Sequence, residues 1–257
     1  MKQMDRFLLL SFCLLLTACV APSPAGRLGQ YVPETGQGPA GDQRLPLERP
    51  LHVSLVLVPD SGGPDAAPSL PDDAIRKVGE DLRAAVSRGY PLIIDRVVHG
   101  TEIPPEIFQG HRWVDLAARL GTSYVLLAVL TSTEQEYPAS LFLGWTTHRQ
   151  PGFRRDNWSL AEAALIDGAT GRVLLHAEGR GWATLDSPTA PGISQWYPVI
   201  YLRPQDPERR IWPPTYEGAP ITLRLVAMEQ AVLRLATGLQ QAWIRQREFE
   251  IESAQPN

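Results

Sequence analysis

Apolar and polar positions in the first third of the chain predict a strand followed by a helix. Residues 51–58 are apolar on both faces of an extended segment, which is typical of a strand covered on both sides. Apolar residues then recur at helical spacing from Ile75 to Val86. Ser69 and Asp72 resemble a capping box, and Gly89 is placed where a helix commonly ends.

Segments with strand-like and helix-like spacing of apolar residues continue to alternate after this first pair of elements. Residues 91–98 and 123–130 are rich in branched apolar residues and predict two further strands. A shorter amphipathic segment from Trp113 to Leu120 predicts a second helix, which ends at Gly121. The first half of the chain is therefore expected to run strand, helix, strand, helix, strand.

The second half predicts a hairpin and then a long helix. Residues 158–166 and 172–178 favour strands, and Asp167 opens the five-residue turn between them. One apolar helical stripe extends from about Thr222 to Glu248. The sequence thus predicts a single α/β domain: a mixed sheet of about five strands, two crossover helices, a hairpin and a long C-terminal helix.

The amino-terminal residues have the layout of a secretory signal. Lys2 and Arg6 precede an apolar run over residues 7–16, which is shorter than the ~20 residues that a membrane-spanning helix needs. The run leads into a four-residue segment that resembles the lipobox of bacterial lipoproteins, Leu16, Thr17, Ala18 and Cys19. This resemblance implies cleavage before Cys19 and attachment of acyl chains that hold the protein on a membrane. Val20, where aspartate would resemble an inner-membrane retention signal, favours the periplasmic side of the outer membrane.

The remaining boundaries follow from composition. Residues 1–18 are predicted to be the signal peptide, and residues 19–50, rich in Pro and Gly, a flexible tether with a mean reach of ~30 Å. Residues 51–250 would form the periplasmic domain and residues 251–257 a polar tail.

Charge and cysteine content exclude several classes of function. The net charge is −4 and no dense cluster of Lys and Arg occurs, so no nucleic-acid partner is expected. The two cysteines are Cys13, which leaves with the signal, and Cys19, which is used by the lipid. The mature domain therefore has no disulfide, no thiolate metal site and no cysteine nucleophile, and no metal or other cofactor is predicted.

Aromatic side chains mark two candidate contact sites. Residues 185–220 are rich in proline and are expected to form a long connection that also carries Trp196, Tyr197, Tyr201, Trp212 and Tyr216. These aromatics could bind a partner protein or could cap the core of their own domain. A third hypothesis places Phe142 and Trp145 on the lipid surface, where tryptophan is favoured.

No catalytic residues are predicted. The chain lacks a nucleophile elbow, a zincin motif, a phosphate loop and a dinucleotide fingerprint. His176 is expected to be an ordinary strand residue, and Glu134 and Glu136 to be solvated at a strand end. A serine triad assembled from scattered residues remains an open alternative, because geometry rather than order in the sequence defines it.

Two phrases resemble known envelope proteins. The phrases AARLGTSYVLLAVL (residues 117–130) and AEAALIDGATGRVLLHAE (residues 161–178) resemble the periplasmic domain of CsgG-type curli secretion lipoproteins and LpoB-type activators of peptidoglycan synthases. Together with SLFLGW (residues 140–145), the hairpin phrase is also similar to the rhombotarget lipoprotein group.

The resemblance implies a non-enzymatic lipoprotein. It would act by contact with an envelope protein, which the sequence does not identify, in envelope assembly, secretion or maintenance. The alternatives are a ligand- or glycan-binding lipoprotein and a hydrolase without a recognisable motif. The oligomeric state is not predicted.

Overall fold

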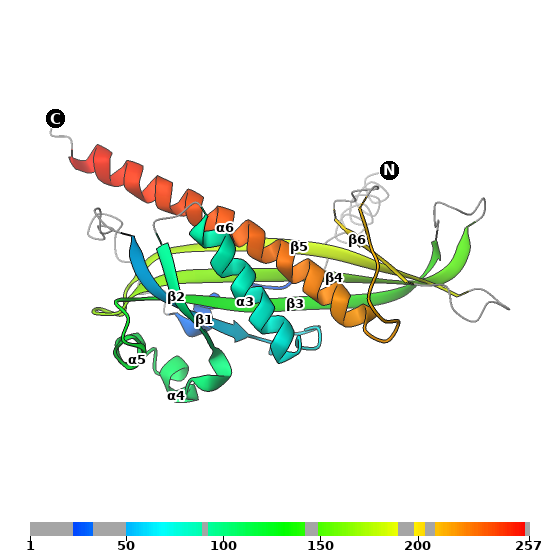
Figure 1. Ribbon diagram of the computed structural model, residues 1–257, viewed down its shortest axis with the longest axis horizontal. Helices are drawn as coiled ribbons and strands as arrows, with labels where there is room; N and C mark the ends of the chain where they lie inside the picture. Colours follow the sequence, from blue (N-terminus) through cyan, green and yellow to red (C-terminus); the bar gives the residue numbers. More distant parts are fainter. Residues whose placement is uncertain are drawn as a thin grey trace, which may run out of the picture.

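A curled mixed sheet of seven strands with helices on both faces forms the body of the computed structural model (Figure 1). The structure describes residues 23–32, 50–88, 92–141, 149–189, 198–203 and 209–254, and every count below refers to these residues. The order of the strands across the sheet is β2-β1-β3-β4-β5-β6-β7. The prediction of about five strands was therefore too low, because two short strands lie where a connection without strands was expected.

The first three strands are parallel, with β1 in the middle. β1 (Leu51–Pro59) pairs on one side with β2 (Leu92–His99) and on the other with β3 (Tyr124–Leu141). α3 (Asp72–Ser87) connects β1 to β2 and packs on one face of the sheet. The predicted order of strands and helices in this half is confirmed.

The return from β2 to β3 crosses the opposite face. It contains the 3-10 turn η3 (Gly100–Glu102), the short helix α4 (Pro105–Gln109) and α5 (Trp113–Leu120). Trp113, only 1% exposed, packs under β1 and β3 with Leu116. α5 ends at Gly121 as predicted, with the left-handed φ of 63° that suits glycine. α4 was not predicted, because five residues carry too little periodicity to identify.

The start of α3 differs from the prediction. Pro71 is the N-cap residue and makes no side-chain capping hydrogen bond, so the proposed capping box of Ser69 and Asp72 is wrong. Asp72 and Asp73 instead lie in the first turn, where their negative charge interacts favourably with the helix dipole.

Three long antiparallel strands extend the sheet. β3 pairs with β4 (Gln150–Asp167) along 18 residues, and β4 pairs with β5 (Val173–Pro188). The predicted hairpin is correct at its turn, where Asp167 accepts hydrogen bonds from the Ala169 amide at 2.8 Å and the Thr170 hydroxyl at 2.9 Å. The strands continue far beyond their predicted ends. β6 (Val199–Leu202) and β7 (Arg210–Ile211) then complete the sheet.

The helix α6 (Ala219–Ala254) has 36 residues and covers the same face as α3. It lies so close to β5 that a Cβ atom at Gly179 or Gly181 would overlap helix backbone, at Ala231 and Leu235 in the first case and at Ala227 in the second. Glycine at these two positions of β5 therefore sets the distance between helix and sheet.

The last turns of α6 continue into the expected polar tail, as far as Ala254. Arg247 and Glu250 form an ion pair at 3.5 Å one turn apart, which favours the helix there. No helix in the described part of the chain has the length and apolar character needed to cross a membrane.

Residues 23–32, expected in the flexible tether, are packed on the α5 face of the sheet. They include the short helix α2 (Leu28–Tyr31). Glu162 of β4 accepts hydrogen bonds from the backbone amides of Arg27 at 2.6 Å and Leu28 at 3.2 Å. Val32 is 7% exposed and joins the core on this face. Sequence composition did not show this, because the partners lie more than 100 residues away.

Candidate functional site

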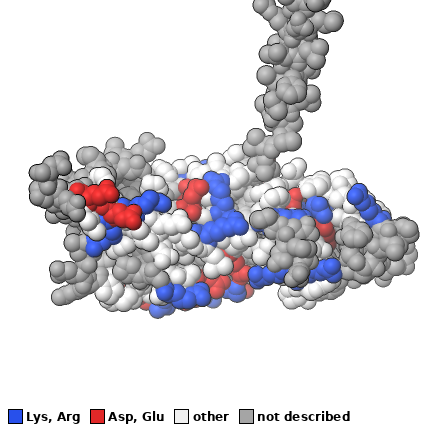
Figure 2. All heavy atoms as spheres, turned by 90° about the horizontal axis from the view of Figure 1, so that it is seen from above, with Lys and Arg blue, Asp and Glu red and all other residues white. Residues whose placement is uncertain are grey.

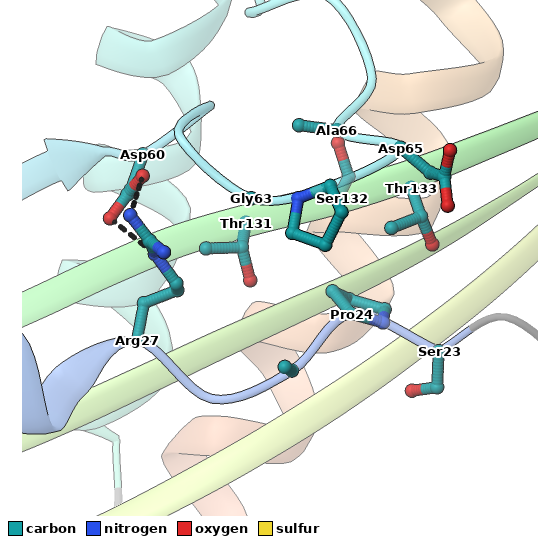
Figure 3. A pocket seen from close by; sticks show the side chains of 12 residues that line it. Ser23, Pro24, Arg27, Asp60, Gly63, Asp65, Ala66, Thr131, Ser132 and Thr133 are labelled. Carbon is teal, nitrogen blue, oxygen red and sulfur yellow. Dashed lines mark hydrogen bonds and ion pairs between the residues drawn. The ribbon is translucent and has the colours of Figure 1, made fainter.

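A cavity of about 240 Å³ lies at the carboxyl end of β1 (Figure 3). The chain leaves β1 towards β2 over one face and returns to β3 over the other, so the carboxyl end of β1, beside the middle of β3, forms a topological switch point, a common place for ligands. The walls come from the amino-terminal segment, the loop after β1 and β3: Ser23, Pro24, Ala25, Arg27, Asp60, Gly63, Pro64, Asp65, Ala66, Thr131, Ser132 and Thr133.

One ion pair closes an end of this cavity. Arg27 donates hydrogen bonds to both carboxylate oxygens of Asp60, at 2.9 and 3.2 Å, and the Tyr31 hydroxyl donates to Asp60 at 3.0 Å. Burial acts to raise the pKa of Asp60, but the hydrogen bonds from Arg27, the Gly62 amide and Tyr31 outweigh it, so the pKa lies below its ordinary value. Burial and the bond to Asp60 raise the pKa of Tyr31 to about 12.

The cavity is small, and the carboxylate that it contains at Asp60 is already paired. It is smaller than the ~300–1,000 Å³ typical of ligand pockets. Asp60 is engaged with Arg27, and Asp65 is exposed. Within the described ranges no group of three or more His, Cys, Asp or Glu side chains could hold a metal ion. The arrangement docks the amino-terminal segment, since Arg27 and Tyr31 of that segment both contact Asp60 after β1.

Asp60→Asn is expected to loosen residues 23–32 without unfolding the domain. The amide side chain keeps the shape but loses the charge that Arg27 and Tyr31 contact. Because the pKa of Asp60 is lowered in the folded protein, its stabilisation is fully present above the ordinary value of 3.8 and is lost as pH falls through the folded value. Protection of the backbone amides of this segment against hydrogen exchange, relative to their intrinsic rate at the same pH, should therefore fall in the variant, and in the wild type below that pH.

Asp65→Asn is the matched control, since Asp65 lines the same cavity from an exposed position with a φ of 57° that asparagine tolerates. Equal exchange in the two variants would contradict the role given to Asp60.

The structure places some aromatic residues of the predicted contact site in the core and others on the surface. Tyr201 lies in β6 and is only 6% exposed, so this side chain belongs to the core. Trp212 and Tyr216 lie between β7 and α6 and are 48% and 40% exposed. The remaining predicted site residues lie outside the described residues: Leu16, Thr17, Ala18, Cys19, Phe142, Trp145, Trp196 and Tyr197.

Sequence reasoning missed two exposed aromatics on the long strands. Phe153 of β4 is 46% exposed and Trp182 of β5 is 36% exposed. The Trp182 ring stacks on Trp158 at 5.9 Å, and the Arg203 guanidinium lies 5.9 Å from its centroid. The alternation of Arg180, Trp182 and Thr184 on one face of β5 was the available signal, but the predicted strand ended before it.

A buried polar network lies beyond this aromatic stack. Asp156, 5% exposed, accepts hydrogen bonds from Thr184 and, at 2.7 Å, from Tyr137. Arg154 binds both carboxylate oxygens of Asp186, at 2.7 and 2.8 Å, which is a strong bidentate geometry. The Asp186 carboxylate raises the pKa of Arg154. These pairs explain how polar strand ends can be buried.

Of the two carboxylates of β3 that were predicted to be solvated, Glu134 contradicts the prediction and Glu136 agrees with it. The Glu134 side chain is 12% exposed and pairs with Arg224 of α6 at 2.9 Å and with Arg155 at 3.4 Å. The prediction of a solvated Glu134 was therefore wrong. Glu136 is 45% exposed and accepts a hydrogen bond from Arg155 at 2.8 Å. His176 is an exposed residue of β5, as predicted.

Surface charge has no dominant sign on the face shown in Figure 2, where Lys and Arg are interspersed with Asp and Glu. On this face the two signs of charge are mixed and not separated into large patches.

Comparisons with known proteins find similarity only among solved structures. No family model and no curated protein matches the chain. A Helicobacter pylori protein described as a neuraminyllactose-binding hemagglutinin homolog is 9% identical over 81% of this chain and 97% of its own, with a TM-score of 0.41. PelC from Paraburkholderia phytofirmans, a dodecamer, is 15% identical over 74% and 91%, with a TM-score of 0.25.

The lipoprotein GNA1162 from Neisseria meningitidis is also similar, with 14% identity over 54% of this chain and 88% of its own and a TM-score of 0.27. These TM-scores are too low to establish a shared fold. The resemblance to CsgG-type, LpoB-type and rhombotarget lipoproteins stays a prediction.

Proposed function

We propose that this protein is a lipid-anchored lipoprotein of the bacterial envelope that acts by binding another envelope protein. The signal layout and the lipobox before Cys19 support anchoring, with Val20 favouring the periplasmic side of the outer membrane. The observation that carries the contact function is the exposure of Trp212 and Tyr216 on a fixed segment.

The backbone around these two aromatics is held at both ends. β7 pairs with β6 just before Trp212, and Ile211 packs against the core under the start of α6. On the other side, the Tyr216 carbonyl accepts a hydrogen bond from the Ala219 amide at 3.2 Å. The Gly218 amide also donates a hydrogen bond to the Thr215 hydroxyl at 3.0 Å. Large aromatics fixed in this way lose little entropy on binding, as expected of anchor residues in protein interfaces.

The proposal assigns the protein no catalytic activity. In support of this, the Asp60 carboxylate at the cavity is committed to Arg27 and Tyr31. The cavity itself favours one second candidate, the binding of a small polar ligand at the switch point. Such a ligand would raise the melting temperature of the domain on its own, whereas a protein contact needs the partner.

The test is a pull-down of the full lipidated protein in mild detergent, read by mass spectrometry. We expect an envelope protein to be captured by the wild type, and its recovery to fall about tenfold or more in Trp212→Ala, since interface anchors contribute about 2 kcal/mol or more. Tyr216→Ala should weaken capture in the same direction. Cys19→Ala should leave the membrane fraction and lose the partner.

Leu233→Ala is the matched control, because Leu233 is a large apolar side chain of α6 that is 50% exposed. Undiminished capture by both aromatic variants would refute the contact surface. A wild type recovered alone, with a melting temperature that rises with a small ligand, would favour the second candidate.

A further inference from the structure

The amino-terminal segment is fixed on the face of β5 that α6 does not cover. The Arg180 guanidinium donates hydrogen bonds to the Ser23 hydroxyl at 2.5 Å and to the Pro24 carbonyl at 3.5 Å. Pro24 is buried, and the hydrogen bonds to Glu162 hold the next residues. The chain therefore enters the folded domain at Ser23 and not at residue 50.

This entry point limits the distance between the domain and the lipid anchor. Ser23 follows Cys19 by four positions, and four residues of fully extended chain span at most about 14 Å. A tether over residues 19–50 would have given a mean reach of ~30 Å. Acyl chains on Cys19 would thus keep the Arg180 side of the domain within about 14 Å of the lipid-bearing residue, close enough to touch the headgroups.

The side chains around this entry point suit a lipid headgroup layer. Residues alternate between the faces of a strand, so Trp182 points to the same side as Arg180, away from α6. Trp182 is 36% exposed, is stacked on Trp158 and has the Arg203 guanidinium beside it. Tryptophan is enriched at membrane interfaces, and arginine can reach headgroup phosphates from an apolar stem.

We propose that this surface, formed by Ser23, Arg180, Trp182 and Arg203, rests on the headgroups of the membrane that holds the anchor. The proposal deepens the proposed function and rests on lipidation of Cys19. It gives the domain an orientation, because α3 and α6 cover the opposite face of the sheet and point away from the lipid. The occupant of the surface is the bilayer itself and not a second protein.

Single-cysteine labelling tests this orientation. The mature chain has only Cys19, and its thiol is taken by the lipid, so one introduced cysteine can carry a fluorophore. Glu178→Cys labels an exposed position on the same face of β5; it removes the ion pair of Glu178 with Arg180 at 3.1 Å but keeps Trp182 and the hydrogen bonds from Arg180 to Ser23 and Pro24. Leu233→Cys, on exposed α6, is the control. The lipidated full chain is reconstituted in vesicles of phosphatidylethanolamine and phosphatidylglycerol that contain headgroup spin-labelled lipid.

Quenching at position 178 should exceed quenching at position 233 several-fold. Equal quenching with Cys19 acylated would overturn the orientation and leave the anchor intact. A mass spectrum without acyl chains on Cys19 would overturn the anchor and with it the proposed function.

A Gly/Ser insertion between Pro22 and Ser23 tests the reach separately. The insertion leaves the described contacts unchanged and lengthens the link to Cys19. Most of the difference in quenching between positions 178 and 233 should therefore disappear. Full retention of that difference would overturn the conclusion that the short link holds this surface on the lipid.

Discussion

Gly181→Ala is expected to abolish cooperative folding or to lower stability by about 3 kcal/mol or more, the upper end of the cost of overpacking. A Cβ atom at Gly181 would overlap the backbone carbonyl of Ala227, and the next nearest atom is the Ala231 amide nitrogen at 2.8 Å. Backbone atoms cannot move aside as a side chain can, so α6 would have to lift from β5. Because domains are stable by only about 5–15 kcal/mol, the change should be visible in the midpoint of urea unfolding.

Gly29→Ala is the control for this substitution. Gly29 is an exposed residue of α2, with no atom within 4 Å of the added Cβ, and alanine favours a helix. Its unfolding midpoint should match or slightly exceed that of the wild type. A Gly181→Ala protein with a wild-type midpoint would show that the helix does not lie this close to the strand.

Glu134→Gln is expected to destabilise the domain by about 3 kcal/mol, the lower end of the cost of leaving a largely buried charge without its partner. The Arg224 and Glu134 side chains are 11% and 12% exposed, and their ion pair links α6 to β3. Glutamine keeps the size of the side chain but leaves the Arg224 guanidinium without the opposite charge. Equilibrium unfolding in urea measures the loss.

Glu80→Gln provides the comparison, since Glu80 and Arg83 form an exposed pair on α3 at 3.7 Å, and surface pairs contribute less than about 1 kcal/mol. The double variant Glu134→Gln with Arg224→Gln should recover part of the lost stability, because no unpaired charge is left. Similar losses for Glu80→Gln and Glu134→Gln would mean that the buried pair has no special weight.

Periodicity was sufficient for the part of the fold in which apolar residues decide the structure. The strands that begin at Leu51 and Leu92, and the helix that ends at Gly121, follow from side chains that are buried or from a backbone that needs glycine. Each of these signals lies within one element, so no distant partner is needed to interpret it.

The outer half of the sheet could not be predicted in the same way. Thr131 and Thr133 of β3 are buried although they are polar, and their strand continues to Leu141. Asp156 is buried because Tyr137 and Thr184 donate hydrogen bonds to it from neighbouring strands. Such cross-strand partners are known only once the strands are paired, so the polar stretch was assigned to strand ends and loops.

The exposure of the candidate contact residues could not be predicted from the sequence either. A count of aromatics between residues 185 and 220 identified Trp212 and Tyr216, which are exposed, but equally Tyr201, which β6 places in the core. Trp182 was missed because its exposure depends on which face of β5 α6 covers, and Gly179 and Gly181 determine that face. Composition indicates a contact site, and the packing of the helix decides which aromatics can serve it.

The position of α6 also determines how a partner can bind to β5. Beyond the short pairing with β6, the edge of β5 carries backbone groups that another extended chain could join by strand addition. Side chains of α6 already occupy these groups: Gln230 accepts a hydrogen bond from the Trp182 amide at 3.0 Å, and Arg234 donates to the Arg180 carbonyl at 2.7 Å. These two contacts protect this part of the edge against β-pairing with another chain, so a partner at this side of β5 would have to bind through side chains.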